Sequence, residues 1–444
     1  MPLSSEKSRM AVWVIVGTMA AVLAGAIVYS STRKESPNVI LIVSETTRAD
    51  HLGCYGYERD TSDNLDGLAK SSVLFTNAVT QAPCTSPAVW NMLTSKYKSE
   101  VPAHNEYITI AEYFRYKGYA TGAFVAHAFL DPQGLNLHQG FDAYDSQCER
   151  DHHNLCARKG WSITNAAIEW MEKHKDGPFF LFLFYFDPHD PYRPVDKFKG
   201  HYTRTDKFDP DRRKATIHVH RPGNRNLTPD YKEFLINAYD EEIRYVDYEV
   251  GRLLSYLEDN DELDNSILVF TADHGEELGD NDYRWDHCQL LSQEELWIPL
   301  VVKMPGQREQ KIVEQPVQVI DIFPTLVDYF ERPALPLFYG TLEGASMLPL
   351  INAEPSTETR SAAAFWKAQR CLYSGSAKYW LRVGKEYLTD VRSGEAIDDP
   401  QLMETMRGRL DKLHEKYFLN RDYDEETIER LRQLGYISDD DEMD

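Results

Sequence analysis

Positive charge is scarce in this sequence of 444 residues, which has 48 lysines and arginines against 71 aspartates and glutamates and a formal net charge of −23. Proteins that bind nucleic acids carry basic patches that neutralise phosphates, and no basic stripe is present here. We therefore expect no nucleic-acid partner. Internal repeats and low-complexity linkers are also absent, which argues against a repeat architecture. Because 42% of the residues are hydrophobic, we expect one large globular domain with a smaller annex.

Cysteine is also scarce, with six residues in the whole chain. An even number is compatible with an oxidising compartment, and Cys148 and Cys156 bracket a short polar loop in which a disulfide could form. Cys54, in GCYGY, is interpreted as a small buried residue, and Cys371 carries no signal.

Long hydrophobic runs are absent except near the N-terminus, where residues 10–32 (MAVWVIVGTMAAVLAGAIVYSST) carry no charge and are flanked by basic residues. About 20 apolar residues suffice to span a bilayer as a helix. We interpret this segment as a transmembrane signal-anchor that follows a short tail of residues 1–9. It would place the body outside the cytoplasm, in the periplasm, an organelle lumen or the extracellular space. The alternative is a cleavable signal peptide, because residues 24–26 (Ala-Gly-Ala) offer a cleavage site.

Beyond this run, short apolar segments alternate with amphipathic ones, which predicts an α/β fold with helices on both faces of a sheet. Strands are expected at residues 38–43, 120–126, 179–186, 266–271 and 298–303. Helices are expected at residues 109–117, 162–174, 230–258 and 319–330. The strands are uninterrupted apolar runs, so we expect both faces of the sheet to be buried.

The pattern of apolar and polar residues changes after about residue 352. A hairpin is expected at residues 377–391 and a surface helix at residues 399–418. We therefore predict a catalytic domain at residues 37–352, a smaller C-terminal α+β subdomain at residues 353–437 and an acidic tail at residues 438–444.

Polar residues follow three of the expected strands: Glu45 the first, His189 the third, and Asp273 and His274 the fourth. Ligands of open α/β sheets bind beyond the carboxyl ends of the strands, so these side chains are expected to converge. Carboxylates with imidazoles suit Zn²⁺ or Mn²⁺, and Ca²⁺ and Mg²⁺ are the alternatives. Each residue alone could be an ordinary polar strand end, but three strands that end alike favour a metal site.

Cys84 and Thr85 stand side by side before a predicted helix, in the stretch TQAPCTSPAVWNMLTS at residues 80–95. Thr85 is well placed as the N-cap of that helix, where free backbone N–H groups favour an anion such as phosphate or sulfate. Capping is the default role for such a hydroxyl. Next to a metal ion, however, the same hydroxyl has the arrangement of a nucleophile.

Six segments resemble, in order, the signature segments of the sulfatase family in the alkaline-phosphatase superfamily. They are PNVILIVSETTRADHLGCYGY, APCTSPAVWNMLTSKY, FYFDPHDPY, AYDEEIRYVDYEVGRLL, LVFTADHGEELGD and LRQLGYI. The resemblance implies a large mixed, mostly parallel sheet flanked by helices, as in alkaline phosphatase, with a smaller C-terminal subdomain. It also implies metal-dependent hydrolysis or transfer of sulfate or phosphate esters through a covalent intermediate.

The chain departs from the sulfatase pattern C-x-P-x-R, whose cysteine is oxidised to formylglycine. Registering Pro87 on that pattern places Thr85 at the nucleophile and Val89 at the arginine, and it leaves Cys84 one residue too far from the proline. Glu45 and Thr46 stand where sulfatases usually have a pair of aspartates. This set resembles the phosphoglycerol and phosphoethanolamine transferases of the same superfamily, which are membrane-anchored with an extracytoplasmic catalytic domain.

The resemblance implies four ligands for one divalent metal, of which Thr85 is also the nucleophile: Glu45, Thr85, Asp273 and His274. His189 and His287 match positions that contact the substrate or a second metal, and one of them would protonate the leaving group. Cys288 follows His287 where the family usually has glycine. Cys84 and Cys288 each adjoin a site residue, so a bond between them is one interpretation, but we favour two unpaired buried thiols.

The sequence thus predicts a metal-dependent hydrolase or transferase that takes a headgroup from a phosphate or sulfate ester onto Thr85. It would pass that group to water or to an acceptor such as a lipid or an envelope glycan. A sulfuric ester hydrolase without formylglycine is one alternative. The other is a non-catalytic sulfatase-like binding protein, which Val89 and Thr46 favour slightly and the intact set of four ligands opposes.

Overall fold

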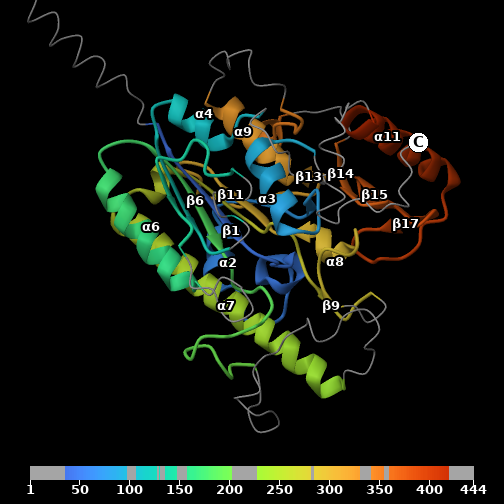
Figure 1. The fold of residues 1–444 in the computed structure, drawn as a ribbon, viewed down its shortest axis with the longest axis horizontal. Coiled ribbons are helices and arrows are strands. Elements are labelled where there is room, and N and C mark those ends of the chain that lie inside the picture. Colours follow the sequence, from blue (N-terminus) through green and yellow to red (C-terminus); the bar gives the residue numbers. More distant parts are fainter. Residues whose placement is uncertain are drawn as a thin grey trace, which may run out of the picture.

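The computed structural model of the protein describes residues 36–97, 107–127, 130, 136–147, 158–202, 228–281, 285–330, 342–354 and 360–419. An eight-stranded sheet forms the centre of this part of the chain (Figure 1). Across the sheet the strands are β12 (Lys311–Val313), β2 (Val73–Phe75), β11 (Leu300–Lys303), β7 (Ser266–Thr271), β1 (Asn38–Ser44), β6 (Phe179–Tyr185), β4 (Ala120–Val125) and β5 (Ala143–Asp145).

The sheet is mixed and mostly parallel, as the resemblance noted in the sequence implies. Strands β7, β1, β6, β4 and β5 run parallel to one another, and so do β12 and β2. Only β11 is antiparallel to both of its neighbours among these described strands. The four neighbours β7, β1, β6 and β4 therefore present their carboxyl ends at the same edge of the sheet.

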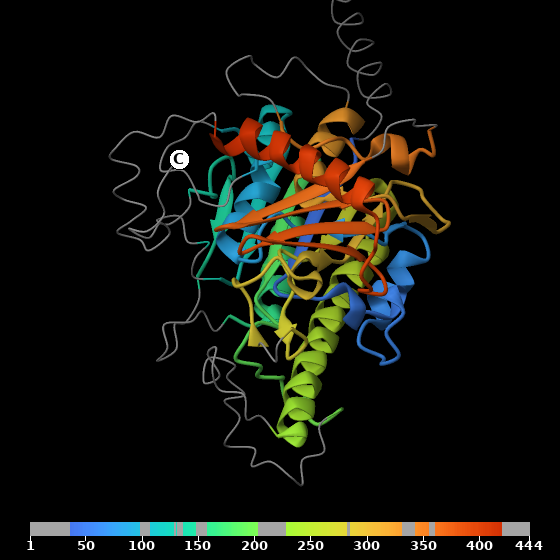
Figure 2. The ribbon, with the colours of Figure 1, turned by 90° about the vertical axis from the view of Figure 1, so that its right-hand side faces the viewer.

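Helices cover both faces of the sheet (Figures 1 and 2). Alternate residues of β1 point to opposite faces. Val39, Leu41 and Val43 pack in one core with α3 (Thr85–Thr94), α4 (Ile110–Tyr116) and α9 (Ile322–Tyr329). Ile40 and Ile42 pack in the other core with α2 (Asp63–Ala69), α6 (Gly160–His174) and α7 (Pro229–Asp259). Burial on both faces explains why the strand sequences are uninterrupted apolar runs.

The strand expected at residues 298–303 is divided in the structure. Strand β10 (Trp297–Ile298) joins β3 (Ala78–Val79) and β13 (Val317–Gln318) in a separate three-stranded sheet, and β11 starts only at Leu300. Pro299 lies between them, and it has no N–H to continue a ladder of hydrogen bonds. The prediction of one continuous strand was therefore wrong at its first residues.

The C-terminal part forms a four-stranded antiparallel sheet, with the strands in chain order: β14 (Ser361–Trp366), β15 (Gln369–Ser374), β16 (Ala377–Arg382) and β17 (Lys385–Asp390). Helix α11 (Pro400–His414) packs Met406 and Leu410 against Leu372 and Tyr379 of this sheet. The expected hairpin, surface helix and α+β subdomain are therefore present. The domain boundaries themselves stay predictions.

The expected membrane location requires a correction. Within the described ranges, every helix is too short or too polar to cross a membrane. Helix α7 has 31 residues, but charged side chains occur along its whole length (PDYKEFLINAYDEEIRYVDYEVGRLLSYLED) and the hydrocarbon core tolerates few of them. The segment 10–32, on which the prediction rested, lies outside the described residues, as do Cys148, Cys156 and the acidic tail. The assignment as a membrane-anchored protein is withdrawn.

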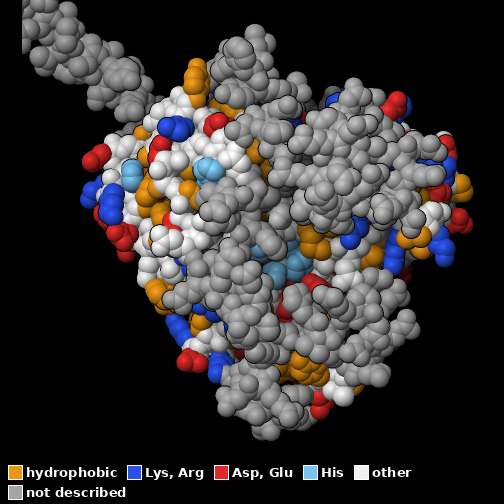
Figure 3. Space-filling view, viewed as in Figure 1, with side chains coloured by type: hydrophobic (Ala, Val, Ile, Leu, Met, Phe, Trp, Pro, Cys, Tyr) orange, Lys and Arg blue, Asp and Glu red, His pale blue; other side chains and the backbone are white. Residues whose placement is uncertain are grey.

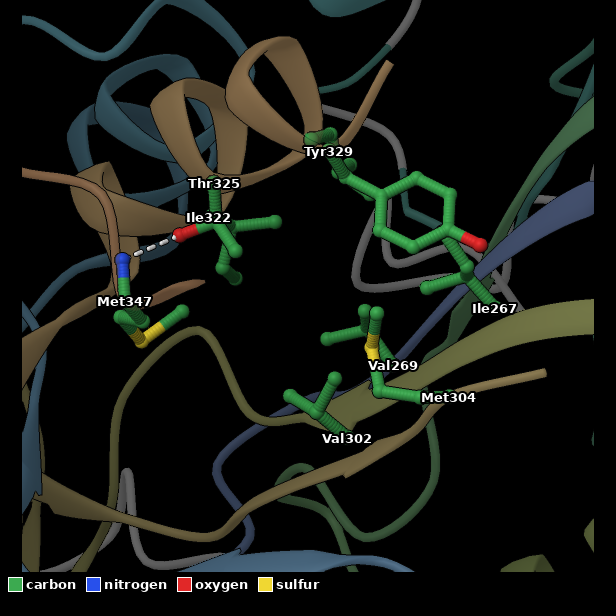
Figure 4. A pocket seen from close by; sticks show the side chains of 9 residues that line it. Ile267, Val269, Val302, Met304, Ile322, Thr325, Tyr329 and Met347 are labelled. Atoms are coloured by element: carbon green, nitrogen blue, oxygen red, sulfur yellow. Dashed lines mark hydrogen bonds between the residues drawn. The ribbon is translucent and has the colours of Figure 1, made fainter. Parts of the chain in front are cut away.

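An apolar cavity of about 10 Å³ lies under α9, where the helix packs on β7 and β11 (Figure 4). Ile267, Val269 and Val302 line its sheet side, and the Met347 N–H donates a hydrogen bond of 2.7 Å to the Thr325 hydroxyl beside it. A volume of this size holds at most about one water molecule. The cavity is a packing gap in the core.

Candidate active site

Residues that follow the four neighbouring parallel strands meet at the carboxyl edge of the sheet. Asp273 follows β7, Glu45 follows β1, His189 follows β6 and His127 follows β4. All four side chains are buried. The structure thus brings together the ends of the three strands expected from the sequence. It adds His127, which was not predicted.

Thr85 lies within this group, at the start of α3. Its hydroxyl oxygen is 2.9 Å from Glu45 Oε1 and 3.2 Å from His274 Nε2, and His274 Nε2 is 3.4 Å from Asp273 Oδ2. Ligands at ~2.0–2.1 Å from a tetrahedral Zn²⁺ are about 3.3 Å apart, so these separations match those of a metal's ligands. Glu45 Oε2 and Asp273 Oδ2 are buried without a hydrogen-bond partner, as expected of oxygens that would bind a cation. The residues fit a divalent metal ion.

The backbone around Asp273 fixes which atoms face the centre of the site. Asp273 Oδ1 accepts hydrogen bonds from the backbone N–H groups of Thr46 at 3.1 Å and His274 at 2.8 Å, which leaves Oδ2 for another partner. His274 Nδ1 lies 2.8 Å from the Gly275 carbonyl oxygen. Because a carbonyl oxygen only accepts, Nδ1 carries the proton and the neutral ring presents the lone pair of Nε2 to Thr85 and Asp273. A cation between the Nε2 lone pair and these oxygen atoms would stabilise the arrangement.

Burial sets the electrostatics of these groups. It raises the pKa of the Glu45 carboxyl well above its ordinary value, and the neighbouring Asp273 carboxylate raises it further. Burial lowers the pKa of His274, and it lowers the pKa of His127 to about 4. The histidines are therefore neutral near pH 7, which is the form that binds metals. A bound cation would favour the ionised form of Glu45 as well.

Thr85 is not the N-cap of α3, as the sequence had suggested. The first helical hydrogen bond runs from the Ala88 N–H to the Cys84 carbonyl at 3.0 Å, so Cys84 is the N-cap and Thr85 is the first helical residue. The Thr85 hydroxyl contacts Glu45 and His274 instead. The N-terminal amides of α3 lie next to it, where they favour an anion.

Cys84 and Cys288 form a disulfide, so the favoured interpretation of two unpaired thiols was wrong. The Cys288 N–H also donates a hydrogen bond of 2.8 Å to the Pro83 carbonyl. Thr85 follows one cysteine and His287 precedes the other. Two site residues that are far apart in sequence are thus linked covalently through their neighbours.

His189 and His287 both lie beside the group. The His287 ring centre is 4.6 Å from that of His274 and 4.9 Å from that of His189. The Nδ1 atom of His189 bonds to the Asp190 carbonyl oxygen, and its Nε2 atom is 3.7 Å from Glu45 Oε1. Figure 3 shows histidine side chains gathered near the middle of one face, beside acidic side chains.

His287 has a carboxylate partner that the sequence analysis did not identify. Its Nδ1 atom is 3.1 Å from Oε1 of Glu276, which is fully buried. Burial raises the pKa of the Glu276 carboxyl well above its ordinary value, and nearby acidic residues add to the effect. Glu276 stands two residues after His274, but nothing in that spacing indicates a contact with His287.

Side chains of the C-terminal sheet hold the loop that follows His287. They donate hydrogen bonds to the carbonyl oxygens of three residues of the loop: Trp366 Nε1 donates to Cys288 at 3.0 Å, Gln369 Nε2 to Gln289 at 2.9 Å and Lys378 Nζ to Leu291 at 2.7 Å. Lys378 is itself buried, and burial lowers its pKa. The position of His287 therefore depends on the C-terminal sheet as well as on the disulfide.

Comparisons with known proteins give a consistent picture. The profile of the family described as Sulfatase matches residues 37–331. The ulvan-active sulfatase of Formosa agariphila is 28% identical over 326 residues, which cover 66% of this chain and 61% of that protein. A protein solved in complex with its substrate D-glucosamine-2-N,6-O-disulfate aligns with a TM-score of 0.71 at 17% identity, covering 87% of this chain and 99% of the other. The phosphonate monoester hydrolase of Agrobacterium radiobacter aligns with a TM-score of 0.67 at 19% identity, covering 88% and 98%.

Proposed function

Because the chain belongs to the sulfatase family, we propose that it is an ester hydrolase that acts on phosphate esters, with Thr85 as the nucleophile. One observation carries the proposal: the Thr85 hydroxyl lies 2.9 Å from Glu45 Oε1 and 3.2 Å from His274 Nε2, inside a group of side chains that fits a divalent cation. A hydroxyl in that place is a candidate nucleophile.

In the proposed reaction, Thr85 is the nucleophile and His287 transfers protons. The Thr85 hydroxyl passes its proton to Glu45 Oε1, to which it donates a hydrogen bond, and its oxygen attacks the phosphorus. The bond between phosphorus and the leaving alcohol breaks while that alcohol takes a proton from His287. Water then attacks the phosphothreonine and gives a proton to His287. The bond between phosphorus and the Thr85 oxygen breaks, which releases phosphate, and Glu45 returns its proton to that oxygen to regenerate the hydroxyl. A divalent cation held by Glu45, Asp273 and His274 would lower the pKa of the Thr85 hydroxyl and neutralise charge on the ester.

The two histidines differ in what they can do at Nε2. His189 uses Nδ1–H on the Asp190 carbonyl, so the neutral ring has a lone pair and no proton at Nε2. His287 has the Glu276 carboxyl at Nδ1, and burial favours the protonated form of that carboxyl. The carboxyl then donates to Nδ1, holds the ring in place and leaves the ring proton on Nε2. We therefore assign the general acid to His287 and a binding role to His189.

Sulfate esters are the second candidate substrates, and the similarity to the ulvan-active sulfatase favours them, with a sulfated glycan as the substrate class. The residue at position 85 favours phosphate. A threonine cannot become formylglycine, whose hydrate gives a sulfated intermediate an easy exit, so a sulfothreonine would be slow to leave. Transfer to a second alcohol instead of water, and a purely binding role, stay untested predictions.

The experiment that tests this proposal identifies the covalent intermediate. The protein is mixed with phosphate and sulfate esters that carry radioactive phosphorus or sulfur, quenched with acid, and digested to locate the label. We expect phosphorus label on the peptide that contains Thr85, and none in Thr85→Ala. Label from sulfur alone would select the second candidate, and label on any other residue would refute Thr85 as the nucleophile.

A further inference from the structure

We propose that Tyr239 of α7 is a positioning residue for the metal site, and that its hydroxyl acts through the backbone of Thr46. Tyr239 is fully buried, and its hydroxyl donates a hydrogen bond of 2.7 Å to the Thr46 carbonyl oxygen. The same hydroxyl accepts a hydrogen bond of 2.9 Å from the Arg48 N–H. The inference rests on the proposed function only in that the site binds a divalent cation, and it does not depend on which ester is hydrolysed.

Thr46 has a backbone conformation that its own side chain opposes. Its φ angle is 51°, in the left-handed region, which a β-branched residue rarely adopts. Such a conformation costs free energy and persists only where the surrounding contacts enforce it. At Thr46 these contacts are the Tyr239 hydroxyl at the carbonyl oxygen and Asp273 Oδ1 at the N–H, 3.1 Å away. The Thr46 backbone is therefore held from both of its polar groups.

The turn at Thr46 connects two of the proposed metal ligands. Glu45 directly precedes Thr46, and the Glu45 N–H donates a hydrogen bond of 3.0 Å to the Tyr185 carbonyl at the end of β6. Asp273 accepts the Thr46 N–H at Oδ1, and its Oδ2 is buried without a hydrogen-bond partner. A change in the Thr46 backbone would disturb Glu45 and Asp273 together. Loss of a group that orients metal ligands typically weakens metal binding by ~10–100-fold.

Tyr239 itself has a fixed position, because the next residue of α7 binds the same loop. Three side chains from the segment after β1 contact the carboxylate oxygens of Asp240: Tyr57 Oη at 2.6 Å, an Arg59 guanidinium nitrogen at 2.7 Å and His51 Nδ1 at 2.6 Å. These contacts do not involve the Tyr239 hydroxyl. Tyr239→Phe should therefore leave α7 in place and remove only the hydrogen bonds to Thr46 and Arg48.

Titration with Mn²⁺ and with Zn²⁺ tests the inference without any substrate. Each protein is stripped with chelator, and the dissociation constant is measured by isothermal titration calorimetry. We expect Tyr239→Phe to bind the ions ~10–100-fold more weakly than the wild type. Equal affinity in Tyr239→Phe and the wild type would overturn this inference alone. A wild type that binds neither ion would refute the metal site itself, and this inference with it.

Tyr245→Phe is the matched control. Tyr245 is another buried tyrosine of α7, and its hydroxyl accepts a hydrogen bond of 2.7 Å from the Trp161 N–H at the start of α6. The substitution removes a comparable hydrogen bond without touching the loop after β1, so the affinity for metal should stay at the wild-type value. An equal loss in Tyr245→Phe and Tyr239→Phe would overturn the inference, because it would indicate a general loosening of the fold.

Substitutions at Thr46 test whether Tyr239 acts through the backbone there. Glycine adopts positive φ angles freely, so Thr46→Gly added to Tyr239→Phe should recover most of the lost affinity. Thr46→Ala also removes the threonine side chain but keeps the Cβ atom, so it should recover little. Equal recovery with glycine and alanine, or none with either, would overturn the inference. So would failure of Tyr239→Phe to fold, judged by circular dichroism, because the hydroxyl would then serve the whole fold.

Discussion

The disulfide between Cys84 and Cys288 spans 204 positions of the chain and joins the residue before Thr85 to the residue after His287. The proposed nucleophile and the proposed general acid are therefore held in place by the same covalent bond. Their relative position needs to be accurate, since catalysis by two groups depends steeply on geometry.

Opening this disulfide should reduce both stability and activity. In the chain-entropy description, a crosslink that closes a loop of this length contributes about 5 kcal/mol. We expect Cys288→Ala, or the wild type in reductant, to melt at a lower temperature and to have a lower kcat. Cys54→Ala is the control, because Cys54 is a free cysteine. A melting temperature that does not respond to reductant would contradict this prediction.

Two substitutions of Thr85 distinguish the loss of its hydroxyl from a change in the position of that hydroxyl. Thr85→Ala removes the hydroxyl, and we expect kcat/KM to fall by at least ~10³-fold. Thr85→Ser keeps a hydroxyl with one methyl group fewer, so it should retain measurable activity. Steady-state kinetics and circular dichroism of both variants check the result. Near wild-type activity in Thr85→Ala would exclude Thr85 as the nucleophile.

The role of His287 is tested by the leaving group. An ester of a nitrophenol leaves without protonation, whereas an alkyl ester needs a proton from an acid. His287→Ala should therefore lose ~10²–10⁴-fold of kcat with the alkyl ester and much less with the nitrophenyl ester. Glu276→Gln should show the same preference in weaker form and a shifted pH profile, because Glu276 acts through His287. His189→Ala should affect both esters alike, and the reverse pattern would exchange the roles of the two histidines.

Glu277 should make the metal-free protein less stable as the pH rises from about 4.5 to about 7. Burial raises the pKa of the Glu277 carboxyl to about 7, whereas the unfolded chain releases this proton at its ordinary value near 4.5. Between these values the folded state holds more protons, so the free energy of unfolding decreases by up to about 1.4 kcal/mol per pH unit for this group. Urea denaturation in chelator at several pH values measures the slope. Glu277→Gln should flatten it, and Glu258→Gln, at an exposed position, should leave it unchanged.

Much of the fold follows from the sequence because the central strands are long and apolar. Strands β1, β4, β6 and β7 each have six or seven residues, and all were predicted. Strands β2, β5 and β12 have three residues each, which is too short for a hydrophobic period to show. The edges of the sheet could therefore not be found in this way.

Glu45, His189, Asp273 and His274 were identified by the rule that polar residues gather at the carboxyl ends of strands, whereas the roles of Thr85 and His287 came from the family resemblance. The same rule applies to His127, which stands two positions after the end of β4. That residue could have been predicted from the sequence. The contact between Glu276 and His287 could not, and the bond between Cys84 and Cys288 could be named only as the less favoured alternative. Each depends on how distant loops fold over the sheet.

The hydrogen bonds from Trp366, Gln369 and Lys378 to the loop after His287 affect how the protein unfolds. A sheet that donates hydrogen bonds to the backbone of the loop after His287 cannot unfold without releasing that loop. The two regions should then form one cooperative unit, with amide protons of Gln289 and Leu291 exchanging with deuterium only as fast as those of β15. Calorimetry should accordingly record a single transition, and inactivation should coincide with it.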